Sequence, residues 1–175
     1  AYGGSCFPKD TRAIVDTGSK FKTDLSIIKA VIKSNTDRSK LLLNRVSKIL
    51  KNKIRNKKIC FLGVTFKANT DDMRESSSIK MIPYLSKKGA KITYFDPTGY
   101  KKEFKNFKNV FNATTIKEAC KDSDLIIIHT EWNDFKSLNF EKLNKKKSFF
   151  IYDMRNILQD EKIKKNTKKY FGIGK

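Results

Sequence analysis

The stretch Lys58-Ile59-Cys60-Phe61-Leu62-Gly63 decides the fold, because it is an apolar run of strand length that ends in a glycine. Similar apolar runs follow it at Lys91–Phe95, Leu125–His129 and Ser148–Tyr152. Helical segments are predicted between these runs, near Ser77–Lys88, Thr115–Lys121 and Phe140–Asn144. Buried strands that alternate with helices predict a parallel sheet covered on both faces. We therefore expect an α/β fold with a Rossmann-like parallel sheet in residues 54–175.

A helical pattern precedes this sheet. From Thr11 to about Lys53, apolar residues recur at three- and four-residue spacings with polar residues between them. The stretch Asp16-Thr17-Gly18-Ser19 is expected to break the first helix from the next. Residues 1–53 are thus predicted as a helical segment, and its apolar stripes are interpreted first as core.

The opening segment, Ala1-Tyr2-Gly3-Gly4-Ser5-Cys6-Phe7-Pro8-Lys9-Asp10, holds the first candidate for chemistry. Its paired glycines allow positive φ and a close approach of the backbone to a ligand, and its proline is typical of the first turn of a helix. Cys6 would then lie just before a helix N-terminus, where the helix dipole and Lys9 favour the thiolate. Asp10, one turn further on, is a candidate base or hydrogen-bond acceptor. A buried, inert structural thiol is the alternative at this point.

Basic residues follow several of the predicted strands. Lys67 and Arg74 come after the first strand, and Arg155 comes after the last one. In parallel sheets, ligands bind beyond the carboxyl ends of the strands, so these side chains are expected to converge on one edge. Each is suited to a phosphate, although an exposed ion pair is the default explanation for any one of them alone.

Several motifs, in the same order along the chain, resemble the nucleotide-sugar dehydrogenases of the UDP-glucose/GDP-mannose dehydrogenase family. They are Gly3–Asp10, Leu62–Lys67, Asn69–Ser76, Tyr94–Pro97, Thr130–Trp132, Asp153–Asn156 and Gly172–Lys175. The branch that oxidises UDP-glucose is the most similar, at Phe7–Asp10 and Thr130–Trp132. The resemblance runs from one end of the chain to the other.

The resemblance implies an NAD-dependent oxidation of UDP-glucose to UDP-glucuronate, a precursor in polysaccharide biosynthesis. It makes Cys6 the nucleophile that forms a thiohemiacetal and then a thioester, and Asp10 the group that assists proton transfer. It places Lys9 and Arg74 at the NAD cofactor. It assigns the UDP-sugar substrate to Tyr2, Gly3, Phe66, Lys67 and Arg155.

The resemblance also implies a domain organisation. Residues 1–53 would be a central segment through which two copies form a homodimer, and residues 54–175 would bind the UDP-sugar. A dinucleotide-binding unit would show Gly-x-Gly-x-x-Gly directly after a strand, and the sequence has no such fingerprint. We therefore expect a C-terminal fragment that lacks the NAD domain and is inactive alone.

Composition narrows the remaining alternatives. The net charge of +21 raises the possibility of a nucleic-acid partner, but the lysines are scattered and no nucleic-acid-binding motif is found. No apolar run is long enough to span a membrane, and the single histidine, His129, predicts no metal site. Three widely spaced cysteines favour a reducing cytoplasm. Two alternatives stay open: a sister enzyme acting on GDP-mannose or a UDP-N-acetylhexosamine, and a non-catalytic binder of nucleotide sugars or polyanions.

Overall fold

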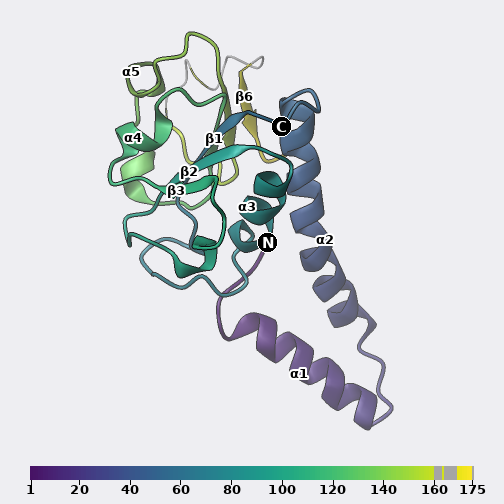
Figure 1. Ribbon diagram of the computed structural model, residues 1–175. Coiled ribbons are helices and arrows are strands. Elements are labelled where there is room, and N and C mark those ends of the chain that lie inside the picture. Colours follow the sequence, from purple (N-terminus) through teal and green to yellow (C-terminus); the bar gives the residue numbers. More distant parts are fainter. Residues whose placement is uncertain (160–162, 164–168, 175) are drawn as a thin grey trace.

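The computed structural model describes residues 1–159, 163 and 169–174 of the chain. Two long helices come first, α1 (Phe7–Lys20) and α2 (Ser26–Ile49). Together they form a hairpin, and α1 and the adjoining part of α2 extend away from the sheet (Figure 1). None of the helices in the described residues is long and apolar enough to cross a membrane.

A six-stranded parallel sheet makes up the rest of the fold. Its strands are β1 (Lys58–Leu62), β2 (Lys91–Phe95), β3 (Val110–Asn112), β4 (Leu125–Ile128), β5 (Phe150–Asp153) and β6 (Tyr170–Gly172). Their order in the sheet is β3-β2-β1-β4-β5-β6, and every neighbouring pair is parallel. This order reverses between β1 and β4, which makes the space beyond their carboxyl ends the switch point where such folds bind ligands. The predicted Rossmann-like α/β fold is confirmed.

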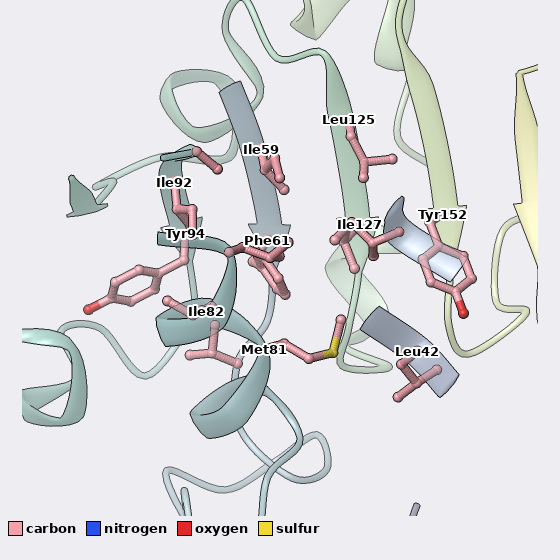
Figure 2. Close-up of a cluster of buried hydrophobic side chains, with 14 of the residues drawn as sticks. Leu42, Ile59, Phe61, Met81, Ile82, Ile92, Tyr94, Leu125, Ile127 and Tyr152 are labelled. Atoms are coloured by element: carbon pink, nitrogen blue, oxygen red, sulfur yellow. The ribbon is translucent and has the colours of Figure 1, made fainter. Parts of the chain in front are cut away.

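Helices cover both faces of the sheet. These are α3 (Ser78–Lys87), α4 (Ile116–Cys120) and α5 (Phe140–Leu143), with short 3-10 turns η1 (Lys102–Phe104) and η2 (Asn133–Phe135). Because successive strand residues point to opposite faces, β1 and β4 contribute to two separate cores. Ile59 and Phe61 pack with α2 and α3 on one face (Figure 2), whereas Cys60 and Leu62 pack with α4 and α5 on the other.

The C-terminal half of α2 belongs to the first of these cores. Leu42, Val46 and Ile49 are buried there beside the side chains of β1 and β4. The helical hairpin is therefore joined to the sheet through one half of α2. The division of the chain into residues 1–53 and 54–175 stays a prediction.

One predicted boundary is wrong. The helix does not break at residues 16–19, because α1 continues to Lys20 and includes Gly18. A Cβ at Gly18 would lie only 2.7 Å from Cδ1 of Leu25, so the glycine permits the chain beyond the helix to fold back closely. The break comes after it, where Lys22 has a φ of 53° and the amide of Thr23 donates to the carbonyl of Gly18.

Candidate active site

The 63–77 loop, which joins β1 to α3, forms the base of the site at the carboxyl edge of the sheet. Gly63 has a φ of +75°, and a Cβ there would lie 2.4 Å from Cβ of Thr130, at the end of β4. On the other side, the amides of Val64 and Thr65 donate to Oδ2 of Asp96, just beyond β2, at 2.8 and 3.4 Å. Neighbouring strand ends therefore fix the start of this loop.

The opening segment of the chain lies against the same loop. The amide of Gly4 donates to the carbonyl of Arg74 at 2.8 Å. Gly4 has a φ of +85°, and a Cβ on it would lie 2.9 Å from Cζ of Phe66. A Cβ on Gly3 would lie 2.9 Å from the carbonyl oxygen of Glu75. The two glycines are thus the residues that allow close contact between segments far apart in the sequence.

Cys6 lies where this contact ends and α1 begins. It is the exposed residue directly before the helix, and the amide of Asp10 donates to its carbonyl at 2.9 Å. Lys9 and Asp10 are exposed on the first turn, with Nζ and Oδ1 3.3 Å apart. The other two cysteines are buried. The expected position of Cys6, before a helix with proline in its first turn, is confirmed.

Arg74 is hydrogen-bonded to Asp72 beside this segment. Its Nε and Nη2 each donate to a different oxygen of Asp72 at 2.9 Å, and its amide donates to Asp72 Oδ1 at 2.8 Å. These bonds lower the pKa of Asp72 and raise the pKa of Arg74, with the neighbouring Cys6 side chain as a smaller cause of the latter. Asp72 therefore braces the loop and orients an exposed guanidinium near the thiol.

Arg155 joins the loops that follow β1, β4 and β5. Its Nε donates to the carbonyl of His129 at 2.8 Å, and its Nη2 donates to the carbonyl of Phe66 at 2.9 Å. Glu131 Oε2 lies 3.0 Å from the same Nε. The side chain is 28% exposed, so it braces the edge and still presents part of its surface to solvent.

His129 is a buried neutral side chain beneath Arg155. Thr130 Oγ1 donates its proton to the carbonyl of Thr65, so it accepts from Nδ1 of His129 at 3.1 Å. Nε2 is then the acceptor for the hydroxyl of Ser77 at 2.8 Å. Burial, and next the charge of Arg155, lower the pKa of His129 to about 3. Among the described residues, no group of three or more His, Cys, Asp or Glu side chains could hold a metal ion.

The remaining predicted residues lie around this edge. Lys67 is exposed, with Nζ 5.5 Å from the centre of the Phe66 ring. Tyr2 packs its ring against Phe7 at 4.7 Å between centroids. Its amide donates to Oδ1 of Asn35 on α2 at 2.8 Å, and Nδ2 of Asn35 donates to its carbonyl at 3.1 Å.

Sequence reasoning missed several residues that build the site. Asn35 lies 33 residues from its partner, in an ordinary polar position of a helix. Glu75, which has a φ of 57°, forms an ion pair with Arg12 at 3.0 Å and so ties α1 to the 63–77 loop. No local pattern indicates either contact. The family-matched stretch around Arg74 was the one signal that included Glu75.

The switch point of this sheet is not built for a dinucleotide. In dinucleotide-binding folds, a glycine-rich turn leads from the first strand directly into a helix, and an acidic residue after the second strand binds the ribose. Here the long 63–77 loop separates β1 from α3. Asp96, after β2, is buried, and its carboxylate accepts from the amides of Val64 and Thr98. Within the described residues, this edge therefore suits a different ligand.

Comparison with known proteins identifies the family. Residues 60–160 match the UDP binding domain of the UDP-glucose/GDP-mannose dehydrogenase family, and residues 1–37 match its central domain. This chain belongs to that family. The matched UDP binding domain contains the 63–77 loop, Glu131 and Arg155, and the matched central domain contains Cys6 and Asn35.

Relatives within the family are similar along nearly the whole chain. UDP-glucose 6-dehydrogenases from Rickettsia prowazekii and Rhizobium meliloti are 40% and 37% identical to it, each over 99% of the chain. The chain spans 41% and 40% of the length of these two relatives. A UDP-glucose dehydrogenase structure from Pyrobaculum islandicum is 26% identical, with a TM-score of 0.81 over 99% of this chain and 38% of its own.

Proposed function

We propose that this chain supplies the nucleophile and much of the nucleotide-sugar site of an NAD-dependent UDP-glucose 6-dehydrogenase. The observation that carries the proposal is the contact of the Cys6 segment with the 63–77 loop, through the Gly4–Arg74 hydrogen bond and the packing of Gly4 on Phe66. This contact brings an exposed thiol to the ligand-binding edge of a domain that matches a UDP binding domain. The relatives named UDP-glucose 6-dehydrogenase support UDP-glucose as the substrate.

The UDP-sugar would lie along the edge between the opening segment and the strand ends. Lys67 is exposed and free to meet a phosphate or sugar hydroxyl, and the exposed part of Arg155 faces the same ligand from across the sheet. The Phe66 side chain lies against Gly3 and Gly4, so these residues and Tyr2 would form the part of the site next to the opening segment. The charge balance suits a diphosphate, because Lys67 has no carboxylate partner among the described residues.

Cys6 would carry the covalent chemistry. NAD, when bound near Lys9 and Arg74, would supply the hydride acceptor, and the two successive oxidations at C6 of the sugar would each use one NAD molecule. The Cys6 thiolate adds to the aldehyde carbon after the first oxidation, which gives a thiohemiacetal, and the second oxidation makes this a thioester. Water then breaks the carbon–sulfur bond, which releases the carboxylate and returns the thiol. Asp10 moves the protons of these steps from the first turn of α1.

Lys9 and Arg74 are the residues this chain would offer to NAD. Both are exposed, 73% and 67%, and Asp72 holds the guanidinium of Arg74 in one orientation. They fit the negatively charged phosphates of the cofactor, but the described edge of the sheet lacks a glycine-rich turn for a dinucleotide. We propose that the NAD-binding domain lies outside these 175 residues and that this chain alone does not turn over substrate.

The helical hairpin would form the interface of a homodimer. Large apolar side chains are exposed along α1 and α2 and just after α1, at Phe7, Ile14, Phe21, Ile27, Val31 and Leu41. Exposed apolar surface of this extent supports a protein partner. Light scattering over a range of concentrations tests this, with a monomer at every concentration as the contrary result.

Titration with nucleotide sugars tests the proposed substrate. We expect saturable binding of UDP-glucose, weaker binding of GDP-mannose, and a dissociation constant about tenfold higher in Lys67→Ala, because one charged contact contributes roughly 1.4 kcal/mol. Lys117→Ala, an exposed lysine on α4, is the matched control and should bind as the unchanged chain does. Binding to a polyanion alone, falling steeply with salt, would instead indicate a non-catalytic binder.

A further inference from the structure

The strongest unassigned feature beside the thiol is the pair of hydrogen bonds between Asn35 and the backbone of Tyr2. A single amide side chain of α2 accepts from the Tyr2 amide at 2.8 Å and donates to the Tyr2 carbonyl at 3.1 Å. It thereby satisfies both polar groups of one residue, as a neighbouring strand would. Asparagine has a low helix propensity, and Asn35 lies mid-way along α2. Its hydrogen bonds to Tyr2 are therefore formed at some cost to the stability of the helix.

Among the described residues, the Asn35–Tyr2 bonds are one of two places where hydrogen bonds attach residues 1–5 to distant parts of the chain. Asn35 holds the segment at residue 2, from the side of α2. The 63–77 loop holds it at residue 4, where the amide of Gly4 donates to the carbonyl of Arg74. Cys6 follows two residues later, directly before α1. The position of the thiol relative to the 63–77 loop therefore depends on two points, at residues 2 and 4 of the segment.

We propose that Asn35 is a positioning residue for Cys6, which holds the opening segment so that the thiol faces the bound sugar. The inference rests on the proposed function, because it assumes that Cys6 meets the substrate. Asn35 acts through the backbone of Tyr2 and needs no contact with the ligand. Within the part of the chain that the structure describes, its loss leaves the Gly4–Arg74 bond as the backbone hydrogen bond that holds the segment to the 63–77 loop.

Removal of the amide should leave the fold intact. Asn35 is half-buried, and a cavity of about 30 Å³ lies beside it, lined among others by Tyr2 and Glu75. A cavity of this size admits a water that can take over the polar groups of Tyr2. Such a water preserves hydrogen bonding but does not fix the distance between the segment and α2. The expected loss is therefore in position rather than in stability.

The test compares three variants of the 175-residue chain. Asn35→Ala removes both bonds, and Asn35→Asp keeps the acceptor for the Tyr2 amide but removes the donor. Asn44→Ala is the matched control, because it makes the same change at an exposed position of the same helix. The measurements are amide hydrogen exchange at Gly4 and at Ile127 of β4, and the rate of alkylation of Cys6 by iodoacetamide with and without UDP-glucose. Cys60 and Cys120 are buried, so the native chain reports on Cys6.

For Asn35→Ala we expect exchange at the Gly4 amide to be about tenfold faster, with exchange at Ile127 unchanged. Protection of Cys6 by UDP-glucose should fall about fivefold, with Asn35→Asp between this variant and the unchanged chain and Asn44→Ala without effect. Unchanged exchange at Gly4 would overturn the inference, and so would equal acceleration at Gly4 and Ile127, since that reports general destabilisation. If UDP-glucose fails to protect Cys6 in the unchanged chain, the proposed function fails, while exchange at Gly4 still decides whether Asn35 fixes the segment.

Discussion

The sheet and the helical hairpin contain the same types of apolar residue but bury them to different extents. On β4, Leu125, Ile126 and Ile127 are all fully buried, because the strand is covered on both faces. On the hairpin, Phe21 is 77% exposed and Ile27 is 79% exposed. An apolar side chain contributes to stability only in proportion to the surface it removes from water. The stability of this chain therefore resides in the sheet and in the half of α2 that covers it, and the outer hairpin adds little.

The largest effect is expected at the joint between β1 and the 63–77 loop. Gly63→Ala places a Cβ 2.4 Å from Cβ of Thr130 in a backbone conformation that side chains rarely adopt. Strain and overpacking together should lower the free energy of unfolding by about 4 kcal/mol. Denaturation by urea measures this loss.

Gly99→Ala is the control for Gly63→Ala. Gly99 also has a positive φ, +80°, but a Cβ there meets nothing within 4 Å. It should therefore cost about 1 kcal/mol, from backbone strain alone. Equal losses in the two variants would show that the contact between the ends of β1 and β4 is not tight.

Matched isoleucine substitutions compare the two regions directly. Ile127→Ala removes a fully buried side chain from β4 and should cost about 3 kcal/mol. Ile27→Ala removes a side chain that is 79% exposed on α2 and should change the free energy of unfolding by less than about 0.5 kcal/mol. Urea denaturation at two protein concentrations gives both values. The small value for Ile27→Ala applies to the monomer at the lower concentration, and a large loss there would contradict the exposure of Ile27. If the proposed homodimer forms at the higher concentration, the loss in Ile27→Ala should grow with concentration, and equal small losses at both would count against an interface through Ile27.

The sequence predicted the central strands well because burial on both faces leaves a continuous apolar run. The runs that contain β1 and β4 stand out for this reason, whereas β3 and β6 were not predicted. Both are three residues long, and Phe111 of β3 is 55% exposed, so neither presents a distinct apolar pattern. The break expected at residues 16–19 is wrong because Gly18 lies inside α1, where it leaves room for the side chain of Leu25 beyond the helix. A local sequence pattern does not show this contact.

For the candidate site, the convergence of the loops could be predicted from the sequence, but the contacts between them could not. A general rule for parallel sheets brought the loops of Lys67, Arg74 and Arg155 to one edge. The partners of Arg155 were not predictable, because two of them are backbone carbonyls. Every residue has a backbone carbonyl, so the residue type does not indicate which one accepts the hydrogen bond. The role of Asn35 was hidden likewise, since its partner is the backbone of Tyr2.

A smaller effect than those at Gly63 and Ile127 is a pH dependence that arises in the sheet. His129 is the single histidine of the sequence, and its pKa is lowered from 6.5 to about 3, first by burial and then by the charge of Arg155. Between these two values the unfolded chain binds a proton that the folded chain does not, so stability is complete above pH 6.5 and falls as the pH falls toward 3. From pH 7 to pH 5 the loss should be about 2 kcal/mol.

His129→Asn should remove most of the change in the free energy of unfolding between pH 7 and pH 5, and should lower this free energy somewhat at pH 7. The lowered pKa values of Asp72 and Asp124 move the titration of these carboxylates further away from this pH range. Burial also lowers the pKa of the Ala1 amino group from 8.0, so the slope with pH that remains in His129→Asn is assigned to this group. The outer hairpin contains no histidine, so amide exchange in α1 should respond to pH in this range no differently in the variant. Stability that stays constant from pH 7 to pH 5 in the unchanged chain would contradict the burial of a neutral His129. A slope that survives in His129→Asn would show that another group near the carboxyl edge of the sheet is titrating.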